Sequence, residues 1–180
     1  MYKIIKVTDK VRVPPEKLGK DVKQSVRSAI SDRLEGFIDP KVGVVLAVVD
    51  IEKIGEGKII PTDAGVHYQT TFKILVYKPE LQEVVQGEVI DNTEFGAFVR
   101  LGSLDGLVHI SQLMDDYVSY DNKNSVFLGK ETKRTLREGD KIRGRIISIS
   151  YTGQQKIGLT MRQPGLGALQ WLEAERKKKK

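Results

Sequence analysis

Three short strand patterns joined by tight turns, between residues 84 and 110, constrain the fold of this chain more than any other feature. The first strand is expected at 84–92, where Val85, Gly87 and Val89 recur at every second position and Asn92 follows three positions later. A second strand is expected at 95–101, and a glycine-bracketed turn leads to a third at 107–110. A three-stranded meander has open edges that must be covered or closed. The pattern therefore predicts a small β-barrel.

The aromatic residues of this meander indicate a binding surface. Phe95 and Phe98 are three positions apart, so a regular strand would place them on opposite faces, but Gly96 and Ala97 between them permit a bulge or a strong twist. The parity of the third strand turns His109 outward. Two phenyl rings and an imidazole side by side would stack unpaired bases. Burial in the barrel core or a subunit contact is the alternative for the two rings, and an ordinary surface position is the alternative for the histidine.

The rest of the barrel is expected at residues 141–149 and 156–160, after a long polar insertion at 115–138. Arg143 and Arg145 share one face of the first of these strands and are suited to phosphate contacts, although plain solvation is an alternative. A C-terminal amphipathic helix, at about 166–178, is expected to bury Leu169 and Leu172. The predicted OB-type barrel domain therefore spans residues 80–180.

Residues 1–79 show a different order of patterns, which predicts an α+β domain with a helix on an antiparallel sheet. An apolar stripe from Leu18 to Phe37 has helical spacing, with Gly36 suited to the C-terminal cap. A turn is expected at 55–57 and a loop at 61–65. The strands are expected, in order, at 2–13, 42–49, 58–60 and 66–77.

Composition narrows the function classes. The 180 residues contain no cysteine, and their net charge of +6 comes largely from Lys177–Lys180, a tail that is either solvated or in contact with an acidic partner. No apolar run is long enough for a membrane helix, and no secretion signal is recognisable, so we expect a cytoplasmic protein. The only two histidines, His67 and His109, are in different predicted domains, and the sequence has no phosphate-binding glycine loop. The one metal candidate is the Asp115–Asp116 pair, and adjacent acidic residues on a loop are usually solvated. We therefore expect no catalysis, no metal and no cofactor.

The barrel half resembles the S1 domain, an RNA-binding OB barrel. The resemblance rests on GEVIDNTEFGAFVRL, on DGLVHISQL and on the two strands between Gly139 and Thr160. It implies that Phe95, Phe98 and His109 face RNA and that Lys156 adds a basic contact on the last strand. Tyr151 departs from the pattern, because many such domains have an aspartate there.

The whole chain resembles the large stalk subunit of archaeal RNA polymerase, known as E-prime, and its eukaryotic counterparts. The matching segments include MYKIIKVTDKVRVPPEKLGKD, VGVVLAVVDIEKIGEGKIIPTDAG, YKPELQEVVQGEV and, near the end, LTMRQPGLGALQWLE, where Gly165 stands in place of an expected aromatic residue. The resemblance implies a heterodimer with the small stalk subunit, known as F, together with docking on the polymerase core and contact with nascent single-stranded RNA. It also implies that a tip loop inserts into the core, and an ordinary hairpin loop is the alternative. The residues at the matching positions are Gly57, Ile59, Ile60, Pro61, Thr62, Asp63 and Gly65.

These observations favour a non-catalytic polymerase subunit that binds RNA. A free-standing S1-domain factor in translation or RNA decay is the alternative, and it needs neither a tip loop nor a dedicated partner. A nuclease is a third hypothesis, and it predicts metal-dependent cleavage of RNA by the chain alone.

Overall fold

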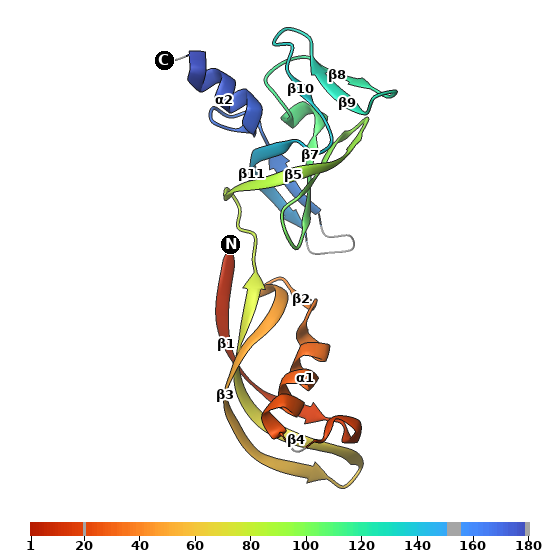
Figure 1. Cartoon of the computed structure of the whole chain (residues 1–180), viewed down its shortest axis with the longest axis vertical. Helices are drawn as coiled ribbons and strands as arrows, with labels where there is room; N and C mark the ends of the chain where they lie inside the picture. The colour runs from red at the N-terminus through yellow and green to blue at the C-terminus, as the bar shows by residue number, and fades with distance from the viewer. Residues whose placement is uncertain (20, 151–155, 179–180) are drawn as a thin grey trace. The chain divides into compact units, whose positions relative to one another are not determined.

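The computed structural model of the chain describes residues 1–19, 21–150 and 156–178 (Figure 1). It consists of two units, Met1–Lys78 and Pro79–Lys180. Each unit has its own cluster of buried hydrophobic side chains, and the two clusters share no residue.

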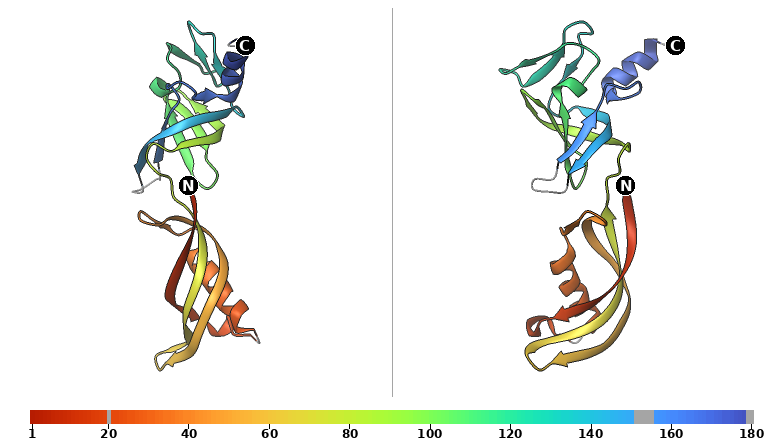
Figure 2. Two further views of the ribbon diagram at one scale, coloured as in Figure 1. Left: turned by 90° about the vertical axis from the view of Figure 1, so that its left-hand side faces the viewer. Right: turned by 180° about the vertical axis from the view of Figure 1, so that it is seen from behind.

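The first unit is a four-stranded antiparallel sheet with one helix against it (Figures 1 and 2). The helix α1 covers one face of the sheet, and a short 3-10 helix, η1, precedes it. The strand order is β1-β4-β3-β2. The elements are β1 (Tyr2–Val13), η1 (Pro15–Lys17), α1 (Val22–Leu34), β2 (Ile38–Asp39), β3 (Gly43–Ile60) and β4 (Asp63–Tyr77).

Helix α1 is shorter than the predicted stripe. Asp21 caps its N-terminus by accepting hydrogen bonds from the backbone N–H groups of Lys23 and Gln24, so the helix begins at Val22. Gly36, with a φ of +79°, lies just beyond its C-terminal cap, as expected. The apolar stripe was too long at both ends, because Leu18 precedes the helix, Phe37 follows it, and both are exposed. Val26 and Ile30 are buried against the sheet.

Strand β3 contradicts the predicted turn at 55–57. It is one continuous strand from Gly43 to Ile60, and repeated register shifts against β4 bend it without ending it. Gly57 pairs with Tyr68 in this ladder, and the approach is so close that a Cβ at Gly57 would lie 2.8 Å from the tyrosine ring. The predicted loop at 61–65 is also shorter, since only Pro61 and Thr62 separate β3 from β4.

The second unit is a closed barrel. Its sheet runs β12-β7-β6-β5-β11, and pairing of β12 with β11 closes it. The barrel strands are β5 (Val84–Thr93), β6 (Gly96–Arg100), β7 (Asp105–His109), β11 (Lys141–Ser150) and β12 (Lys156–Thr160). A register shift between Val89 and Asp91 allows Asn92 to share the inner face with Val89, and both side chains are buried.

The insertion between β7 and β11 contains its own small sheet, and it lies at the same end of the barrel as the C-terminal helix (Figure 1). The anchor of that helix is Trp171, which is 8% exposed and donates a hydrogen bond to the carbonyl of Thr135. Leu169 and Leu172, the predicted buried residues, are half-buried. The elements are η2 (Ile110–Gln112), β8 (Val118–Asp121), β9 (Val126–Gly129), β10 (Thr135–Leu136), β13 (Gly167–Ala168) and α2 (Leu169–Lys178).

The predicted fold class is confirmed: an α+β unit with a helix on an antiparallel sheet is followed by a five-stranded OB-like barrel with an insertion and a C-terminal helix. Neither α-helix in the described part of the chain is long and apolar enough to cross a membrane.

Candidate nucleic-acid interface

Phe95 and Phe98 lie together on the outside of the barrel. Their ring centroids are 5.9 Å apart and the ring planes are almost perpendicular, at 88°. Phe98 points outward from β6, whereas Phe95 lies in the β5–β6 turn, where strand parity no longer applies. The turn, and not a bulge between the two residues, therefore brings both rings to one surface. Phe95 is 46% exposed and Phe98 is half-buried, so ring area remains accessible.

His109 is on the same face of the neighbouring strand. Phe98 pairs with Leu107, and Gly96 pairs with His109, so these four residues share one side of the β6–β7 ladder. The His109 ring is exposed, and Ser111 orients it: the backbone N–H of Ser111 donates to Nδ1, and Ser111 Oγ lies 2.8 Å from the same nitrogen. We call Phe95, Phe98 and His109 the barrel platform.

Gly96 lies between the platform residues Phe95 and Phe98, at a point where β6 and β7 approach closely. A Cβ at this position would lie 2.3 Å from the carbonyl oxygen of Val108, so only glycine permits this approach of β6 to β7.

Two of the predicted basic residues, Arg143 and Arg145, lie on β11, which is not adjacent to β6 or β7 in the sheet. Arg143 pairs with Gln86 and Gly167, and it lines a small hollow with Arg176 of α2. Arg145 pairs with Thr160 of β12, the strand that separates β11 from β7, and its Nε is buried without a hydrogen-bond partner. Lys156 begins β12, but its side chain lies outside the described residues, as does Tyr151.

A hollow of about 290 Å³ next to the barrel platform contains residues that the sequence reasoning missed. The ring of Tyr117 is 77% exposed beside it, and Lys130 Nζ is 6.0 Å from the ring centroid. Tyr117 is one of three aromatic residues in the insertion, with Tyr120 and Phe127, and the sequence alone does not distinguish it from the other two. The hollow is lined by Ile110, Ser111, Met114, Asp116, Tyr117, Val118 and Arg162.

The two acidic residues considered as a metal candidate have other partners. Backbone and side-chain hydrogen bonds from Thr132, with a backbone hydrogen bond from Glu131, lower the pKa of Asp116 to about 2. Asp115 forms an ion pair with Arg162, Oδ1 to Nη2, at 2.5 Å. No group of three histidine, cysteine, aspartate or glutamate side chains in the described ranges is arranged to hold a metal ion.

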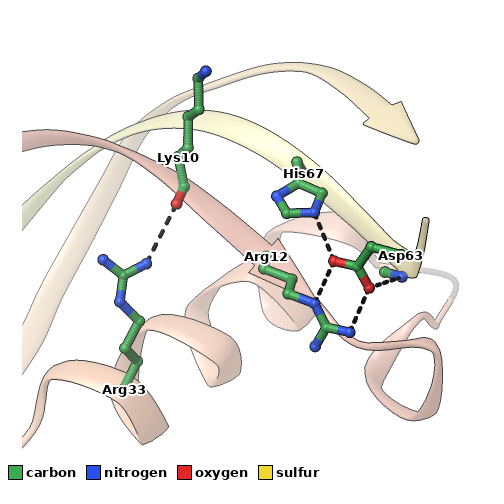
Figure 3. Close-up of polar contacts among 6 residues, drawn as sticks. Lys10, Arg12, Arg33, Asp63 and His67 are labelled. Carbon is green, nitrogen blue, oxygen red and sulfur yellow. Dashed lines mark hydrogen bonds and ion pairs between the residues drawn. The ribbon is translucent and has the colours of Figure 1, made fainter. Parts of the chain in front are cut away.

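The predicted tip is the end of the β3–β4 hairpin, and its apolar residues are exposed: Ile59 is 74% exposed and Ile60 is 44% exposed. Asp63 fixes the base of this tip (Figure 3). Its carboxylate accepts two hydrogen bonds of 2.6 Å from the Arg12 guanidinium, lies 2.9 Å from His67 Nε2 and accepts the backbone N–H of Gly65. The Arg12 hydrogen bond is the main reason why the pKa of Asp63 lies well below its ordinary value.

The face of the first sheet opposite α1 carries a second exposed apolar area. Tyr2 is 55% exposed and Ile4 is 61% exposed at the start of β1, next to the half-buried Leu75 of β4. Further along this face, Glu52 pairs with Lys6 and Lys73, and hydrogen bonds from these lysines lower its pKa to about 2. We call Tyr2, Ile4 and Leu75 the open sheet face.

An α+β unit followed by an OB-like barrel with exposed aromatic side chains defines an S1-domain protein, and the family models agree. Residues 8–64 match the "SHS2 domain found in N terminus of Rpb7p/Rpc25p/MJ0397", and residues 78–160 match the "S1 RNA binding domain".

Relatives of similar length identify the family. DNA-directed RNA polymerase subunit Rpo7 of Saccharolobus shibatae is 39% identical over 98% of this chain and 100% of its own length. DNA-directed RNA polymerase III subunit RPC8 of Saccharomyces cerevisiae is 28% identical over 81% of this chain and 71% of its own. Ribonuclease R of Buchnera aphidicola, from Schizaphis graminum, is 37% identical over 46% of this chain but only 11% of its own. The chain belongs to the Rpo7 family of DNA-directed RNA polymerase subunits, as its sequence resemblance predicted.

Proposed function

We propose that this chain is a non-catalytic stalk subunit of RNA polymerase that binds nascent single-stranded RNA, forms a heterodimer with the small stalk subunit and docks on the polymerase core. The carrying observation is the combination of two facts: the similarity to Rpo7 extends over nearly the whole chain, and the barrel exposes Phe95, Phe98 and His109 on one face.

The barrel platform supports the RNA-binding part of the proposal. Exposed aromatic rings on a small barrel stack bases of any sequence, and nearby basic residues hold the backbone. Of the predicted basic residues, Lys156 belongs to β12, the strand paired with β7, and Arg145 belongs to β11, one strand further on. We therefore expect little sequence preference and an affinity that falls steeply with salt.

The exposed tip supports docking on the core. Ile59 and Ile60 present apolar area at the end of a hairpin whose base is fixed by Asp63, Arg12 and His67 (Figure 3). A preorganised tip loses little conformational entropy when it enters a pocket. The open sheet face supports a second contact, and we assign it to the small stalk subunit because an apolar sheet face without a covering helix is suited to a protein partner.

Both histidines have hydrogen-bonding roles in the proposed non-catalytic subunit. His67 supports Asp63 at the tip, and Ser111 orients His109 on the barrel platform. In this proposal the nucleotidyl transfer belongs to other polymerase subunits.

The test separates RNA binding from assembly. Substitution of Phe95, Phe98 and His109 by alanine in the reconstituted polymerase should weaken crosslinking of exiting RNA and leave stalk assembly intact. The matched control, Ile59→Ser with Ile60→Ser, should weaken association with the core and leave binding of free RNA unchanged. Unchanged crosslinking in the first variant would place the RNA site elsewhere.

Affinity purification of the native protein tests the alternative. We expect the small stalk subunit and the polymerase core to co-purify. Ribosomes or exonuclease subunits in their place would support a free-standing RNA-binding factor, and the partial similarity to Ribonuclease R is the observation that keeps this alternative in view.

A further inference from the structure

The hollow beside the barrel platform has the composition of a nucleotide-binding subsite. Ile110, Met114 and Val118 supply apolar walls, and the exposed Tyr117 ring stands at its side. Its charged and hydroxyl-bearing residues are Ser111, Asp116 and Arg162, with Tyr117 at the side. An open aromatic ring over an apolar floor with hydrogen-bond donors near it is the arrangement that stacks a base and holds its phosphate.

The hollow is continuous with the barrel platform through the backbone. The N–H of Ile110 donates a 2.9 Å hydrogen bond to the carbonyl of Phe95, so one wall residue is directly attached to a platform residue. Ser111 lines the hollow and also orients the His109 ring. Arg162 Nη1 lies 3.5 Å from the Ser111 carbonyl oxygen. A strand of RNA that leaves Phe95 and His109 on this side meets the hollow next.

The charges around the hollow permit a phosphate. Arg162 is 47% exposed at its side chain, and its partner Asp115 is 78% exposed. An ion pair this open to water contributes little stability, so a phosphate can replace Asp115 on the guanidinium at small cost. Asp116 does not compete for Arg162, because hydrogen bonds from Thr132 and Glu131 occupy its carboxylate. Lys130 adds a second cation beside Tyr117.

We propose that Tyr117 and Arg162 form a second RNA subsite, in which one nucleotide beyond those on the barrel platform stacks its base on Tyr117 and places its phosphate on Arg162. This inference rests on the proposed RNA-binding function and extends the path of the transcript from the barrel onto the insertion. The insertion would then contact RNA itself, in addition to the contacts made by the barrel platform.

Binding of two RNA lengths to the full-length protein tests the proposal. The probes are a tetra-adenylate, which the barrel platform alone can hold, and a dodeca-adenylate, which extends past it. Tyr117→Ala should weaken binding of the dodecamer about tenfold and leave the tetramer unchanged. Tyr117→Phe, the matched control, should bind both as the unmodified protein does. Arg162→Gln should weaken the dodecamer and reduce the slope of log affinity against log salt by about 0.7.

The outcomes separate this inference from the function on which it rests. Unchanged dodecamer binding by Tyr117→Ala, with both lengths still dependent on Phe95 and Phe98, would overturn the second subsite alone. Failure of the unmodified protein to bind either length would overturn both proposals. If Tyr117→Ala instead weakened association with other polymerase subunits and left RNA binding unchanged, the hollow would be a protein contact. Because the Tyr117 ring is so exposed, Tyr117→Ala should keep the thermal midpoint of the unmodified protein.

Discussion

Asp63 shows how one carboxylate can fix a projecting hairpin. It stands at the first position of β4, and Arg12, near the end of β1, reaches it with two hydrogen bonds. The strand register explains why Arg12 reaches Asp63: Arg12 lies opposite His67, and His67 also contacts the Asp63 carboxylate. Arg12 of β1 and two residues that are four positions apart on β4 therefore hold the base of the tip.

We expect the stability contributed by Asp63 to be lost in acid. Its folded-state pKa lies below the ordinary value of 3.8, chiefly because of Arg12, so the contribution is fully present above that value and is lost as the pH falls through the folded-state pKa. Asp63→Asn should lower the thermal midpoint at pH 7, and the gap to the unmodified protein should narrow below about pH 3.8. Circular dichroism melts of both proteins at pH 7 and pH 3 measure the gap. An Arg12→Gln variant should show the same narrowing, and a gap that does not change with pH would contradict the ionic role.

Gly96 is the residue on which the close approach of β6 and β7 depends. Gly96→Ala would place a Cβ 2.3 Å from the Val108 carbonyl oxygen, and we expect it to cost about 1–3 kcal/mol of unfolding free energy. Gly144→Ala is the matched control, since a Cβ on β11 would meet its nearest neighbour, the Thr160 carbonyl oxygen, at an ordinary 3.5 Å. Urea unfolding followed by Trp171 fluorescence measures both, and equal midpoints for the two variants would contradict the argument.

At the scale of the element, Trp171 attaches α2 to the barrel unit. The indole is 8% exposed, donates to the Thr135 carbonyl and has the Arg134 guanidinium 5.6 Å from its ring centroid, while Arg134 also pairs with Glu175 of the same helix. Trp171→Ala should cost about 3–5 kcal/mol of unfolding free energy. Trp171→Phe should recover most of the packing but not the hydrogen bond. Urea unfolding followed by circular dichroism measures the loss, and a midpoint within error of the unmodified protein would show that the helix is not anchored here.

The elements also show where sequence patterns suffice. Alternation predicted β4, β5 and β11, and Gly102 and Gly106 located the turn between β6 and β7. The continuous β3 was not predictable, because its bulges depend on the register against β4 and a glycine inside a strand has the same local pattern as one in a turn. The sheet within the insertion was missed because β8 and β9 have four residues each and β10 has two, too few for a strand pattern to stand out.

The candidate site shows the same limit. The outward position of His109 follows from strand parity alone, but the contact of Phe95 with Phe98 depends on where β5 ends and β6 begins. Arg143 and Arg145 do share a strand, as their spacing indicates, yet their neighbours come from α2 and β12, which sequence spacing cannot place. Tyr117 and Arg162 are 45 positions apart and meet at one hollow only through the fold of the insertion.

At the scale of the whole molecule, the two hydrophobic cores argue for two cooperative units. The first core includes Phe72, at 1% exposed, and the second includes Phe127, at 0% exposed. The single tryptophan, Trp171, belongs to the second core, so its fluorescence reports unfolding of that unit. Substitution of Phe72 and of Phe127 can therefore be compared through the fluorescence of Trp171, which reports on the second unit alone.

We expect Phe127→Ala to shift the Trp171 fluorescence transition in urea to a lower midpoint, because truncation of a buried phenylalanine costs about 3–5 kcal/mol. Phe72→Ala should leave that transition in place and shift only the part of the circular dichroism signal that comes from the first unit. Equal displacement of the fluorescence midpoint by both variants would show that the two cores unfold as one. If the two units unfold separately, a substitution that destabilises the first unit leaves the barrel folded and its RNA binding measurable. The comparison of docking variants with RNA-binding variants depends on this independence.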